Sequence, residues 1–323
     1  MQSEMEYIYR TYQLRSFSKA AESLYITQPA LSMAIRKVED SLGMPIFDRS
    51  VRPMGLTAAG EAYIDYIKKT YYLEQEMNQR LQDIRSVNTG SIRMGGSHYI
   101  NAYILPNVLA GFTTEHPNIS IEIVESSSDA LSKMLKEREV DLTFNCNPKF
   151  MADFERYPAF EDHILLAVPK TFEINKKLTG QALCASDIIS HRHLLSDCPC
   201  VTLDTFQRTE FILLAAGNNL RDRVKQLFHE ANFKPIIKME LSQLVTAYHL
   251  ADASLGATFV SDRLVTTNQD NLFYYKLDSA LTARLFYMLL PSKMYTSRAV
   301  HSFVDYCMCC LNAPKEQKHE AYD

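Results

Sequence analysis

The hydrophobic pattern between residues 16 and 60 predicts two short helices joined by a tight turn and followed by a small basic loop. In the first helix, Ala20, Ala21 and Leu24 form one apolar face. Ser18 is expected to cap the N-terminus of this helix, because a serine hydroxyl accepts a free backbone N–H there. The small apolar side chains allow a second helix to cross closely. The layout is that of a winged helix-turn-helix, whose second helix enters the major groove of DNA.

The second helix has distinct start and stop signals. Thr27 is expected to cap it, and Pro29 lies in its first turn, where a missing N–H costs little. Gly43 is expected to end it in a left-handed conformation. A generic helical hairpin, the alternative, needs neither the Thr-Gln-Pro start nor a basic loop directly afterwards. The pattern therefore favours a DNA-reading helix.

Residues 57–88 are predicted to form one long helix with apolar side chains near helical spacing. Thr57 is expected to cap it, and neither Pro nor Gly interrupts it before Gly90. A helix of about 30 residues is about 45 Å long. Its apolar stripe needs a partner, because an isolated helix would leave that stripe in water. Asn88, Thr89 and Gly90 are expected to form a hinge.

From Ser91 onward, short apolar strands alternate with helices, which is typical of a parallel α/β sheet. Strands are expected at residues 92–95, 119–125, 141–144, 164–168, 211–214, 236–240, 257–260 and 285–290. Helices are expected at residues 103–115, 129–137, 220–230, 242–253 and 297–311. A second subdomain is expected to start at the strand 164–168, with a return to the first near residues 265–275. The polar residues 314–323 are expected to be disordered.

Charge contributes little to this interpretation. The 323 residues carry a net charge of −4, and residues 1–56 hold seven basic and six acidic side chains. The nucleic-acid prediction therefore rests on the motif. The N-terminus lacks the basic-then-apolar pattern of a signal peptide, and no run approaches the roughly 18 apolar residues of a membrane span. We expect a cytoplasmic protein with no membrane partner.

The chain has seven cysteines, and an odd number disfavours a disulfide framework. His191 and His193 precede Cys198 and Cys200, which are ligand types that suit zinc. Their spacings are not those of structural zinc sites, so plain loop thiols are favoured over metal binding or redox sensing. Three further cysteines are expected on a buried face of the last helix: Cys307, Cys309 and Cys310. No metal and no cofactor is predicted.

Residues 16–60 resemble the DNA-binding domain of LysR-type transcriptional regulators. The matching positions are Ser16-Phe17-Ser18, Ala20-Ala21, Leu24, Thr27 to Ser32, Ile35, Val38-Glu39, Leu42-Gly43, Ile46-Phe47, Arg49 and Leu56 to Gly60. The later segments resemble the effector-binding domain of the same family at Leu105-Pro106, Phe112, Pro117, Gly217 and Leu220-Arg221.

The resemblance implies an α/β protein with a helical N-terminal domain. It divides the chain into a winged helix-turn-helix at 1–58, a linker and dimerisation helix at 59–89, an effector-binding domain at 90–313 and a polar tail at 314–323. The effector-binding domain is expected to be periplasmic-binding-protein-like, with two α/β subdomains. The long helix is expected to pair antiparallel with its twin, which gives a homodimer or homotetramer.

DNA contacts are expected on the second helix and the wing. Gln28 and Ser32 can form hydrogen bonds with base edges. Arg49 and Arg52 flank the wing and are expected to contact phosphate or enter the minor groove. Arg36 and Lys37, on the same helix, can reach bases or phosphates. The complete predicted DNA-binding set is Ser18, Thr27, Gln28, Pro29, Ser32, Met33, Arg36, Lys37, Arg49 and Arg52.

Met33 departs from the family pattern, in which many relatives carry a polar or basic residue after the recognition-helix serine. A thioether can touch a thymine methyl group but cannot form a bidentate contact with guanine. We therefore expect an unusual operator preference.

Small polar residues follow three of the expected strands, at the ends where open α/β sheets bind ligands. Free backbone N–H groups and a helix dipole favour an anionic ligand there. Ordinary helix capping is the alternative for each residue alone. The predicted effector-binding set is Ser97, His98, Ser128, Gly217, Asn218 and Asn219, with Asn145, Cys146 and Asn147 expected on the floor of the site. His98 is expected to tune ligand charge or pH response.

A ligand-responsive DNA-binding regulator is the favoured function. Its expected partners are a double-stranded DNA operator, a small-molecule effector and RNA polymerase. The alternatives are a DNA-binding protein that ignores ligands and an enzyme that uses the cleft. An enzyme is disfavoured, because the sequence shows no nucleophile–base set, Gly-rich phosphate loop or metal-ligand spacing. No catalytic residue is predicted.

Overall fold

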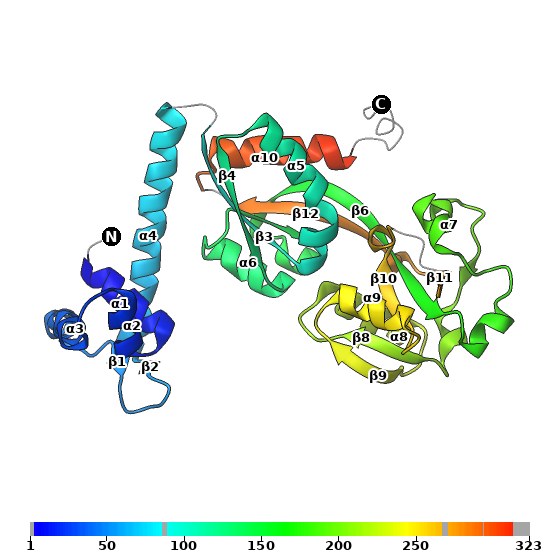
Figure 1. The fold of residues 1–323 in the computed structure, drawn as a ribbon, viewed down its shortest axis with the longest axis horizontal. Helices are drawn as coiled ribbons and strands as arrows, with labels where there is room; N and C mark the ends of the chain where they lie inside the picture. The colour runs from blue at the N-terminus through cyan, green and yellow to red at the C-terminus, as the bar shows by residue number, and fades with distance from the viewer. Residues whose placement is uncertain (1–2, 86–88, 267–270, 293, 313–323) are drawn as a thin grey trace. The chain divides into compact units, whose positions relative to one another are not determined.

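The computed structural model describes residues 3–85, 89–266, 271–292 and 294–312. The chain divides into two compact units, Met1–Ser86 and Val87–Asp323 (Figure 1). The expected polar tail at 314–323 lies outside the described residues, as does Asn88 of the expected hinge.

The first unit is a helical domain with a two-stranded wing. Its elements are α1 (Ser3–Leu14), α2 (Phe17–Ser23), α3 (Gln28–Leu42), β1 (Phe47–Asp48), β2 (Gly55–Leu56) and α4 (Ala58–Arg85). The strands pair antiparallel, with Phe47 opposite Leu56. Helix α1 was not predicted from the sequence. It completes the core by burying Met5 and Ile8 against α2 and α3, so the two-helix motif is covered by a third helix.

Helix caps fix the ends of these short elements. The cap of α2 is Ser16, whose hydroxyl accepts from the Lys19 N–H at 3.4 Å. The prediction that Ser18 caps this helix was therefore wrong, because the helix begins one residue before Ser18. The other predictions hold: Thr27 accepts from the Ala30 N–H at 3.4 Å, and Gly43 ends α3 with φ +69°. Thr57 accepts from the Gly60 N–H at 3.0 Å at the start of α4.

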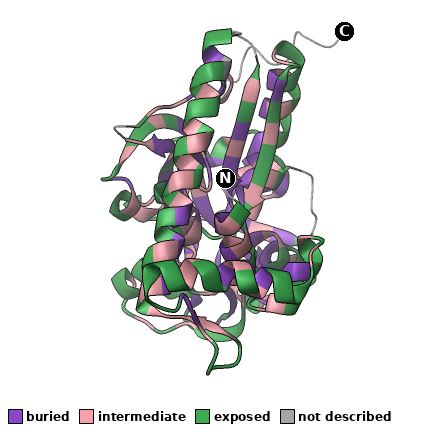
Figure 2. Cartoon of the chain, turned by 90° about the vertical axis from the view of Figure 1, so that its left-hand side faces the viewer, coloured by how far each residue is buried: buried purple, intermediate pink, exposed green. Residues whose placement is uncertain are grey.

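Helix α4 has exposed residues along much of its length (Figure 2), and several of them are large and apolar. The exposed apolar side chains are Tyr66, Tyr71, Leu73, Met77, Leu81 and Ile84. Most of them follow one another at spacings of three, four or seven residues, so they share one side of the helix. No helix among the described residues combines the length and apolar character needed to cross a bilayer.

The second unit is built on a mixed sheet with the strand order β4-β3-β5-β12-β6-β11-β7, and β10 also pairs with β6. Its strands are β3 (Gly90–Gly96), β4 (Ile119–Glu125), β5 (Leu142–Asn145), β6 (Phe154–Pro169), β7 (Cys200–Val201), β8 (Glu210–Leu214), β9 (Ile236–Leu241), β10 (Thr258–Ser261), β11 (Leu272–Leu277) and β12 (Ala283–Pro291). Its α-helices are α5 (Leu105–Glu115), α6 (Ser128–Lys136), α7 (Ala185–Ile189), α8 (Asn219–Glu230), α9 (Leu244–Asp252) and α10 (Arg298–Asn312).

Strand β6 belongs to both subdomains of this unit. Its first part, up to His163, pairs with β12, and from Ile164 onward it pairs with β10 and β11. The predicted strand 164–168 was therefore only the second half of a longer one. The predicted return to the first subdomain near residues 265–275 was wrong, because β11 still pairs with the second half of β6 and the return is made by β12.

Helices cover both faces of the first subdomain's sheet. Helices α5 and α10 pack together on one face, and α6 packs on the other (Figure 1). Phe112 and Phe303 meet edge to face between α5 and α10, with ring centroids 5.1 Å apart. The helix predicted over residues 103–115 instead begins as a π-helical turn, Ile100–Ile104, and continues as α5. This wider turn places Tyr99 and Ile100 in the core at its start.

Candidate nucleic-acid interface and effector site

The first half of α3 presents an exposed face that holds both polar and apolar residues. Gln28 is exposed in the first turn, and Met33 is 67% exposed one turn further along. Leu31 and Ile35 are buried on the opposite side of the helix. Of the ten predicted DNA-binding residues, Ser32 is half-buried and the other nine are exposed: Ser18, Thr27, Gln28, Pro29, Met33, Arg36, Lys37, Arg49 and Arg52. Their role in DNA binding stays a prediction.

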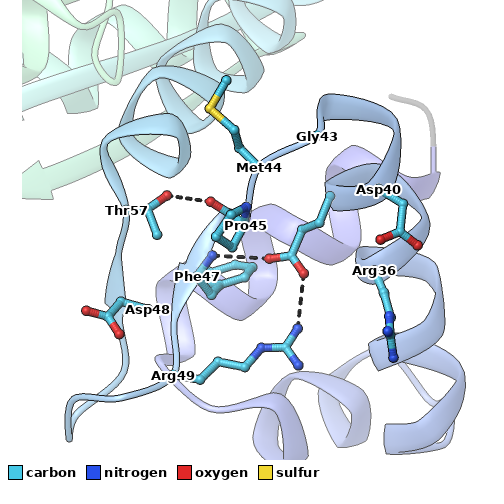
Figure 3. Close-up of a pocket in the computed structure, with 10 residues that line it drawn as sticks. Arg36, Asp40, Gly43, Met44, Pro45, Phe47, Asp48, Arg49 and Thr57 are labelled. Carbon is cyan, nitrogen blue, oxygen red and sulfur yellow. Dashed lines mark hydrogen bonds and ion pairs between the residues drawn. The ribbon is translucent and has the colours of Figure 1, made fainter.

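Glu39 connects α3 to the base of the wing. Its Oε1 accepts from the backbone N–H groups of Ile46, at 2.8 Å, and Phe47, at 3.3 Å. Its Oε2 lies 3.2 Å from an Arg49 guanidinium nitrogen (Figure 3). That guanidinium lies 4.9 Å from the Phe17 ring centroid. Arg49 is therefore held by contacts within the domain. The sequence predicted a DNA contact for Arg49 but not these intramolecular contacts. The arrangement fixes the wing relative to α3.

A groove of about 620 Å³ lies between the second half of α3 and the wing (Figure 3). Arg36 and Arg49 line it, but so do Glu39, Asp40 and Asp48. Three carboxylates outnumber two guanidinium groups, so the groove is not suited to phosphate. The first half of α3 and the loop between β1 and β2, which carries Arg52, lie outside this groove and are exposed.

The ends of β3 and β4 lie side by side in the second unit. These strands are parallel with Gly96 opposite Glu125, and the Ser126 N–H donates to the Gly96 carbonyl at 3.4 Å. Ser97 is half-buried and follows β3 directly. The segment that contains Ser128 follows β4. The parallel register therefore brings the two predicted effector segments of the first subdomain to one edge of the sheet.

The predicted residues at this edge have distinct local roles. His98 Nδ1 lies 3.2 Å from a carboxylate oxygen of Glu125, and both side chains are partly exposed. The cap of α6 is Ser127, which accepts from the Ala130 N–H at 3.3 Å. Ser128 is half-buried in the first turn of α6, so its hydroxyl is not the capping group.

A residue of the second subdomain reaches the same edge. Cys146, which follows β5, donates from Sγ to Oδ1 of Asn219 at 2.9 Å. Gly217 has φ +86°, a conformation that glycine adopts without strain, and it turns the chain into α8. Asn218 caps α8 by accepting from the Leu220 N–H at 2.9 Å. Asn218 therefore fits the ordinary capping alternative, whereas Asn219 contacts the opposite subdomain.

Two arginines near Cys146 were not predicted from the sequence. Arg223 lies one turn after Asn219 on α8, and its Nη1 donates to the carbonyls of Leu281, at 3.0 Å, and Ala283, at 3.2 Å. Its Nε is buried and has no hydrogen-bond partner within the described ranges. The i, i+4 spacing from Asn219 was a usable signal for Arg223. Arg284 is buried on β12 and had no local signal.

Burial dominates the chemistry of Cys146. It raises the thiol pKa to about 11, although Arg284 and Arg223 act in the opposite direction. The side chain is therefore a neutral thiol at physiological pH, which is the form that donates to Asn219. The floor residue Asn145 is also buried, and its amide donates to the Ser132 hydroxyl at 3.1 Å. Asn147 accepts from the Lys149 N–H at 3.1 Å, so both asparagines have structural partners.

The histidine and cysteine loop does not form one cluster. His193 is buried, and its Nε2 lies 3.0 Å from Asp262, a residue absent from the predicted sites. Cys198 is buried and Cys200 is exposed. On α10, Cys307 is buried, Cys310 is half-buried and Cys309 is exposed. The prediction of a buried cysteine face on the last helix therefore holds for Cys307 and not for Cys309.

Two protein-family models match nearly the whole chain. The model for bacterial regulatory helix-turn-helix proteins of the lysR family matches residues 3–61, and the model for the LysR substrate binding domain matches residues 85–309. An uncharacterized HTH-type transcriptional regulator of Bacillus subtilis, YcgK, is 30% identical over 93% of this chain and 92% of its own length. A probable RuBisCO transcriptional regulator of Trieres chinensis is 24% identical over 90% of each chain.

Solved structures show the same fold. Full-length CbnR complexed with its target DNA superposes with a TM-score of 0.66 at 17% identity, over 94% of this chain and 98% of CbnR. A full-length OxyR variant from Pseudomonas aeruginosa gives a TM-score of 0.65 at 22% identity, over 98% of each chain. The chain therefore belongs to the LysR family of DNA-binding transcriptional regulators, with an N-terminal helix-turn-helix domain and a C-terminal effector-binding domain.

Proposed function

We propose that this regulator is controlled by a small anionic effector bound where the two subdomains of its second unit meet. The observation that carries the proposal is the 2.9 Å hydrogen bond from Cys146 to Asn219. It brings the floor of the first subdomain within contact of the first turn of α8 in the second. A ligand at this point can therefore contact both subdomains at once.

The charge at this point supports an anion. Arg223 is held by two carbonyl oxygens, and its buried Nε lacks a partner among the described residues. A buried donor left unpaired costs about 1–3 kcal/mol, so a carboxylate that accepts from it would gain that amount. The N-terminus of α8 adds a partial positive charge. We place the hydroxyls of Ser97 and Ser128, at the neighbouring strand ends, on the same ligand.

DNA reading is assigned to α3 and the wing. Gln28 and Ser32 contact base edges in the major groove, and Met33 packs against a thymine methyl group. Arg52 contacts the phosphate backbone or the minor groove next to the wing. The regulator acts in the cytoplasm, and RNA polymerase is its proposed partner at the promoter.

Assembly is assigned to α4. Its exposed stripe includes Leu73, at 66%, and Ile84, at 81%. Large apolar side chains with this exposure are stabilised by a second copy of the helix, which covers them. We propose a homodimer through α4 that is extended to a homotetramer. A two-fold assembly reads a two-fold site, so the operator is an interrupted palindrome.

The effector acts by changing the balance between two arrangements of the subdomains. A ligand shifts that balance only by its difference in affinity for the two arrangements. Couplings of this kind are typically about 1–3 kcal/mol. The shift alters the packing of the effector domains, and hence the spacing of the paired DNA-binding domains.

A thermal-shift screen with small carboxylates identifies candidate effectors, since a ligand of the native state raises its stability by mass action. Operator footprinting with and without the best compound then tests the site. The double variant Ser97→Leu/Asn219→Leu is expected to lose the effector-dependent change in the footprint and keep basal operator binding.

Arg223→Met is expected to weaken effector affinity at least about tenfold, as loss of a charged hydrogen bond implies. The matched control is Thr114→Leu on the exposed surface of α5. An unchanged effector response in the double variant would place the ligand elsewhere.

A further inference from the structure

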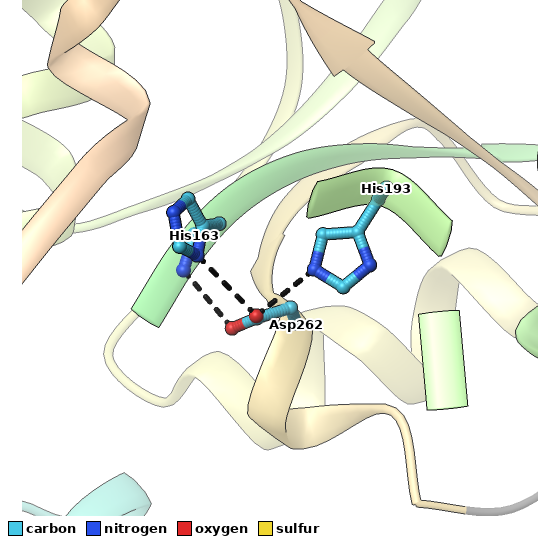
Figure 4. Close-up of side chains that lie close together, drawn as sticks. All are labelled: His163, His193 and Asp262. Atoms are coloured by element: carbon cyan, nitrogen blue, oxygen red, sulfur yellow. Dashed lines mark hydrogen bonds and ion pairs between the residues drawn. The ribbon is translucent and has the colours of Figure 1, made fainter. Parts of the chain in front are cut away.

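Three side chains with metal-ligand chemistry meet in the second subdomain, although they come from distant parts of the chain (Figure 4). They are His163 on β6, His193 in the short 3₁₀ turn Arg192–Leu194, and Asp262 directly after β10. Asp262 Oδ2 lies 3.0 Å from Nε2 of His193 and 3.6 Å from Nδ1 of His163. All three ligand atoms lie within 4.8 Å of one another.

The carboxylate of Asp262 is held in place by the backbone. Its Oδ1 accepts from the N–H of His163 at 3.0 Å and from the N–H of Arg263 at 2.9 Å. This leaves Oδ2 directed at the two imidazole rings. The carboxylate is therefore held with Oδ2 facing both histidines before any ion binds.

The two histidines are also positioned by their surroundings. His193 is 1% exposed, and its Nδ1 is buried with no hydrogen-bond partner within the described ranges. Burying a polar ring costs free energy, and the one hydrogen bond to Asp262 offsets only part of that cost. His163 has a second carboxylate on its other side, since Nε2 lies 3.7 Å from an oxygen of Glu161. A carboxylate next to the far nitrogen of a histidine is the usual outer arrangement at zinc sites.

We propose that His163, His193 and Asp262 bind a divalent transition-metal ion of the zinc class. Two imidazoles and one carboxylate suit zinc and its neighbours, whereas calcium and magnesium prefer oxygen ligands alone. In a tetrahedral zinc site, ligand atoms about 2.0–2.1 Å from the metal lie about 3.3 Å apart. The separations of 3.0 and 3.6 Å at Asp262 fall on either side of that value. Three protein ligands leave the fourth tetrahedral position to a water molecule.

The position of this metal site gives it a defined structural effect. His163 lies opposite Ala283 of β12, and the next residue, Ile164, lies opposite Ser261 of β10. His163 is thus the residue at which β6 passes from one subdomain to the other. A bound ion ties this crossover to two segments of the second subdomain. The metal therefore acts on the same strand that links the subdomains, and it does so independently of the anionic effector.

The test uses the full-length protein, stripped of metal by a chelator and then titrated with Zn²⁺ by calorimetry. One equivalent is expected to bind and to raise the melting temperature, because a ligand of the native state stabilises it. His163→Gln and Asp262→Asn are each expected to lower Zn²⁺ affinity at least about tenfold, the lower limit seen even for residues that only support metal ligands. The matched control is His301→Gln, an exposed histidine on α10, which is expected to bind as the wild type does.

Circular dichroism of each variant without metal establishes that it is folded. His163→Gln carries the test if Asp262→Asn does not fold, because His163 is only half-buried. Replacing Zn²⁺ with Co²⁺ then identifies the ligand type. A spectrum without a thiolate-to-metal charge-transfer band supports the nitrogen and oxygen site. Unchanged Zn²⁺ affinity in folded His163→Gln overturns the proposal. So does a thiolate band that disappears in Cys198→Ser/Cys200→Ser, since the metal would then bind those cysteines.

Discussion

Asp162 on β6 and Arg284 on β12 lie directly opposite each other in the strand register and form a buried, bidentate ion pair. Arg284 Nε donates to Oδ1 at 2.7 Å, and Nη2 donates to Oδ2. Oδ2 also accepts from the hydroxyls of Tyr99, at 3.0 Å, and Ser261, at 2.8 Å. The pair therefore joins four segments next to the point where β6 changes subdomain.

Arg284→Met is expected to lower the free energy of unfolding by about 3–5 kcal/mol, because it leaves the Asp162 carboxylate buried without its cation. The double variant Asp162→Leu/Arg284→Met is expected to recover most of that loss, since apolar side chains of similar volume replace both charges. Tyr99 and Ser261 keep a partner in the double variant, because their hydroxyl oxygens lie 2.8 Å apart. The free energies of unfolding of the single and the double variant are measured by urea denaturation, with circular dichroism as the signal. A loss below about 1 kcal/mol in the single variant would contradict a structural role for the pair.

Gln28→Ala is expected to weaken operator binding by about 1–3 kcal/mol and to relax the sequence preference at one base pair, as loss of a direct base contact does. Ser41→Ala, at the far end of the same exposed helix, is the matched control. Binding of labelled operator DNA and of single-base operator variants provides the measurement. If Gln28→Ala leaves both affinity and preference unchanged, α3 does not read bases as proposed.

Arg52→Ala is expected to weaken specific and nonspecific DNA alike, because a phosphate contact carries no sequence information. The slope of log affinity against log salt should fall by about one unit. Lys170→Ala removes one exposed cation from the second unit and serves as the control for net charge. A weakening confined to the specific operator would assign Arg52 to base reading instead.

Leu73→Glu/Leu81→Glu is expected to shift the protein to smaller assemblies, because it places charge within the exposed apolar stripe of α4. Gln75→Glu adds charge to the same helix outside the stripe and is expected to leave the assembly intact. Light scattering at micromolar concentration, without DNA, gives the assembly mass. A wild-type monomer under these conditions would refute the proposed role of the helix.

Cys146 is expected to react slowly with iodoacetamide at pH 8, because its pKa of about 11 keeps the thiol protonated. Its alkylation rate should rise as the pH approaches that value and more thiolate forms. Cys200 is exposed and provides the internal comparison. Peptide mass spectrometry after timed labelling gives both rates, and unfolding in urea should make them similar. Rapid labelling of Cys146 in the folded protein at pH 8 would contradict its burial.

Local signals in the sequence predict the elements that depend on neighbouring residues. The cap at Thr27 and the stop at Gly43 define α3, and β4 spans the predicted residues 119–125. The first half of β6 escaped prediction because its exposed and buried residues do not form an apolar run. Its position depends on β12, whose partner residues lie far away in the sequence. The same reasoning explains why helix α1 was missed, since its apolar face is completed by α2 and α3.

For the site residues too, local patterns could be predicted from the sequence, whereas contacts between distant segments could not. The strand ends that carry Ser97 and Ser128 could be predicted, because polar residues after apolar strands are a local pattern. The contact between Cys146 and Asn219 joins residues 73 positions apart, and the Asp162–Arg284 pair spans 122 positions. No spacing within one segment specifies such contacts. The cluster of His163, His193 and Asp262 could not be predicted for the same reason: the sequence places His193 near the cysteines but gives no signal that joins it to His163 and Asp262.

The order of strands across the sheet has a consequence for synthesis of the chain. Strand β12 lies between β5 and β6 in the sheet, yet among the described strands it is the last to leave the ribosome. The strands of the second subdomain are all made before this inner strand of the first subdomain is available. A nascent chain that has not reached Ala283 leaves the edges of both β5 and β6 unpaired, which is the state most exposed to aggregation. Strand β12 thus completes a sheet whose first strand begins 193 residues earlier, at Gly90.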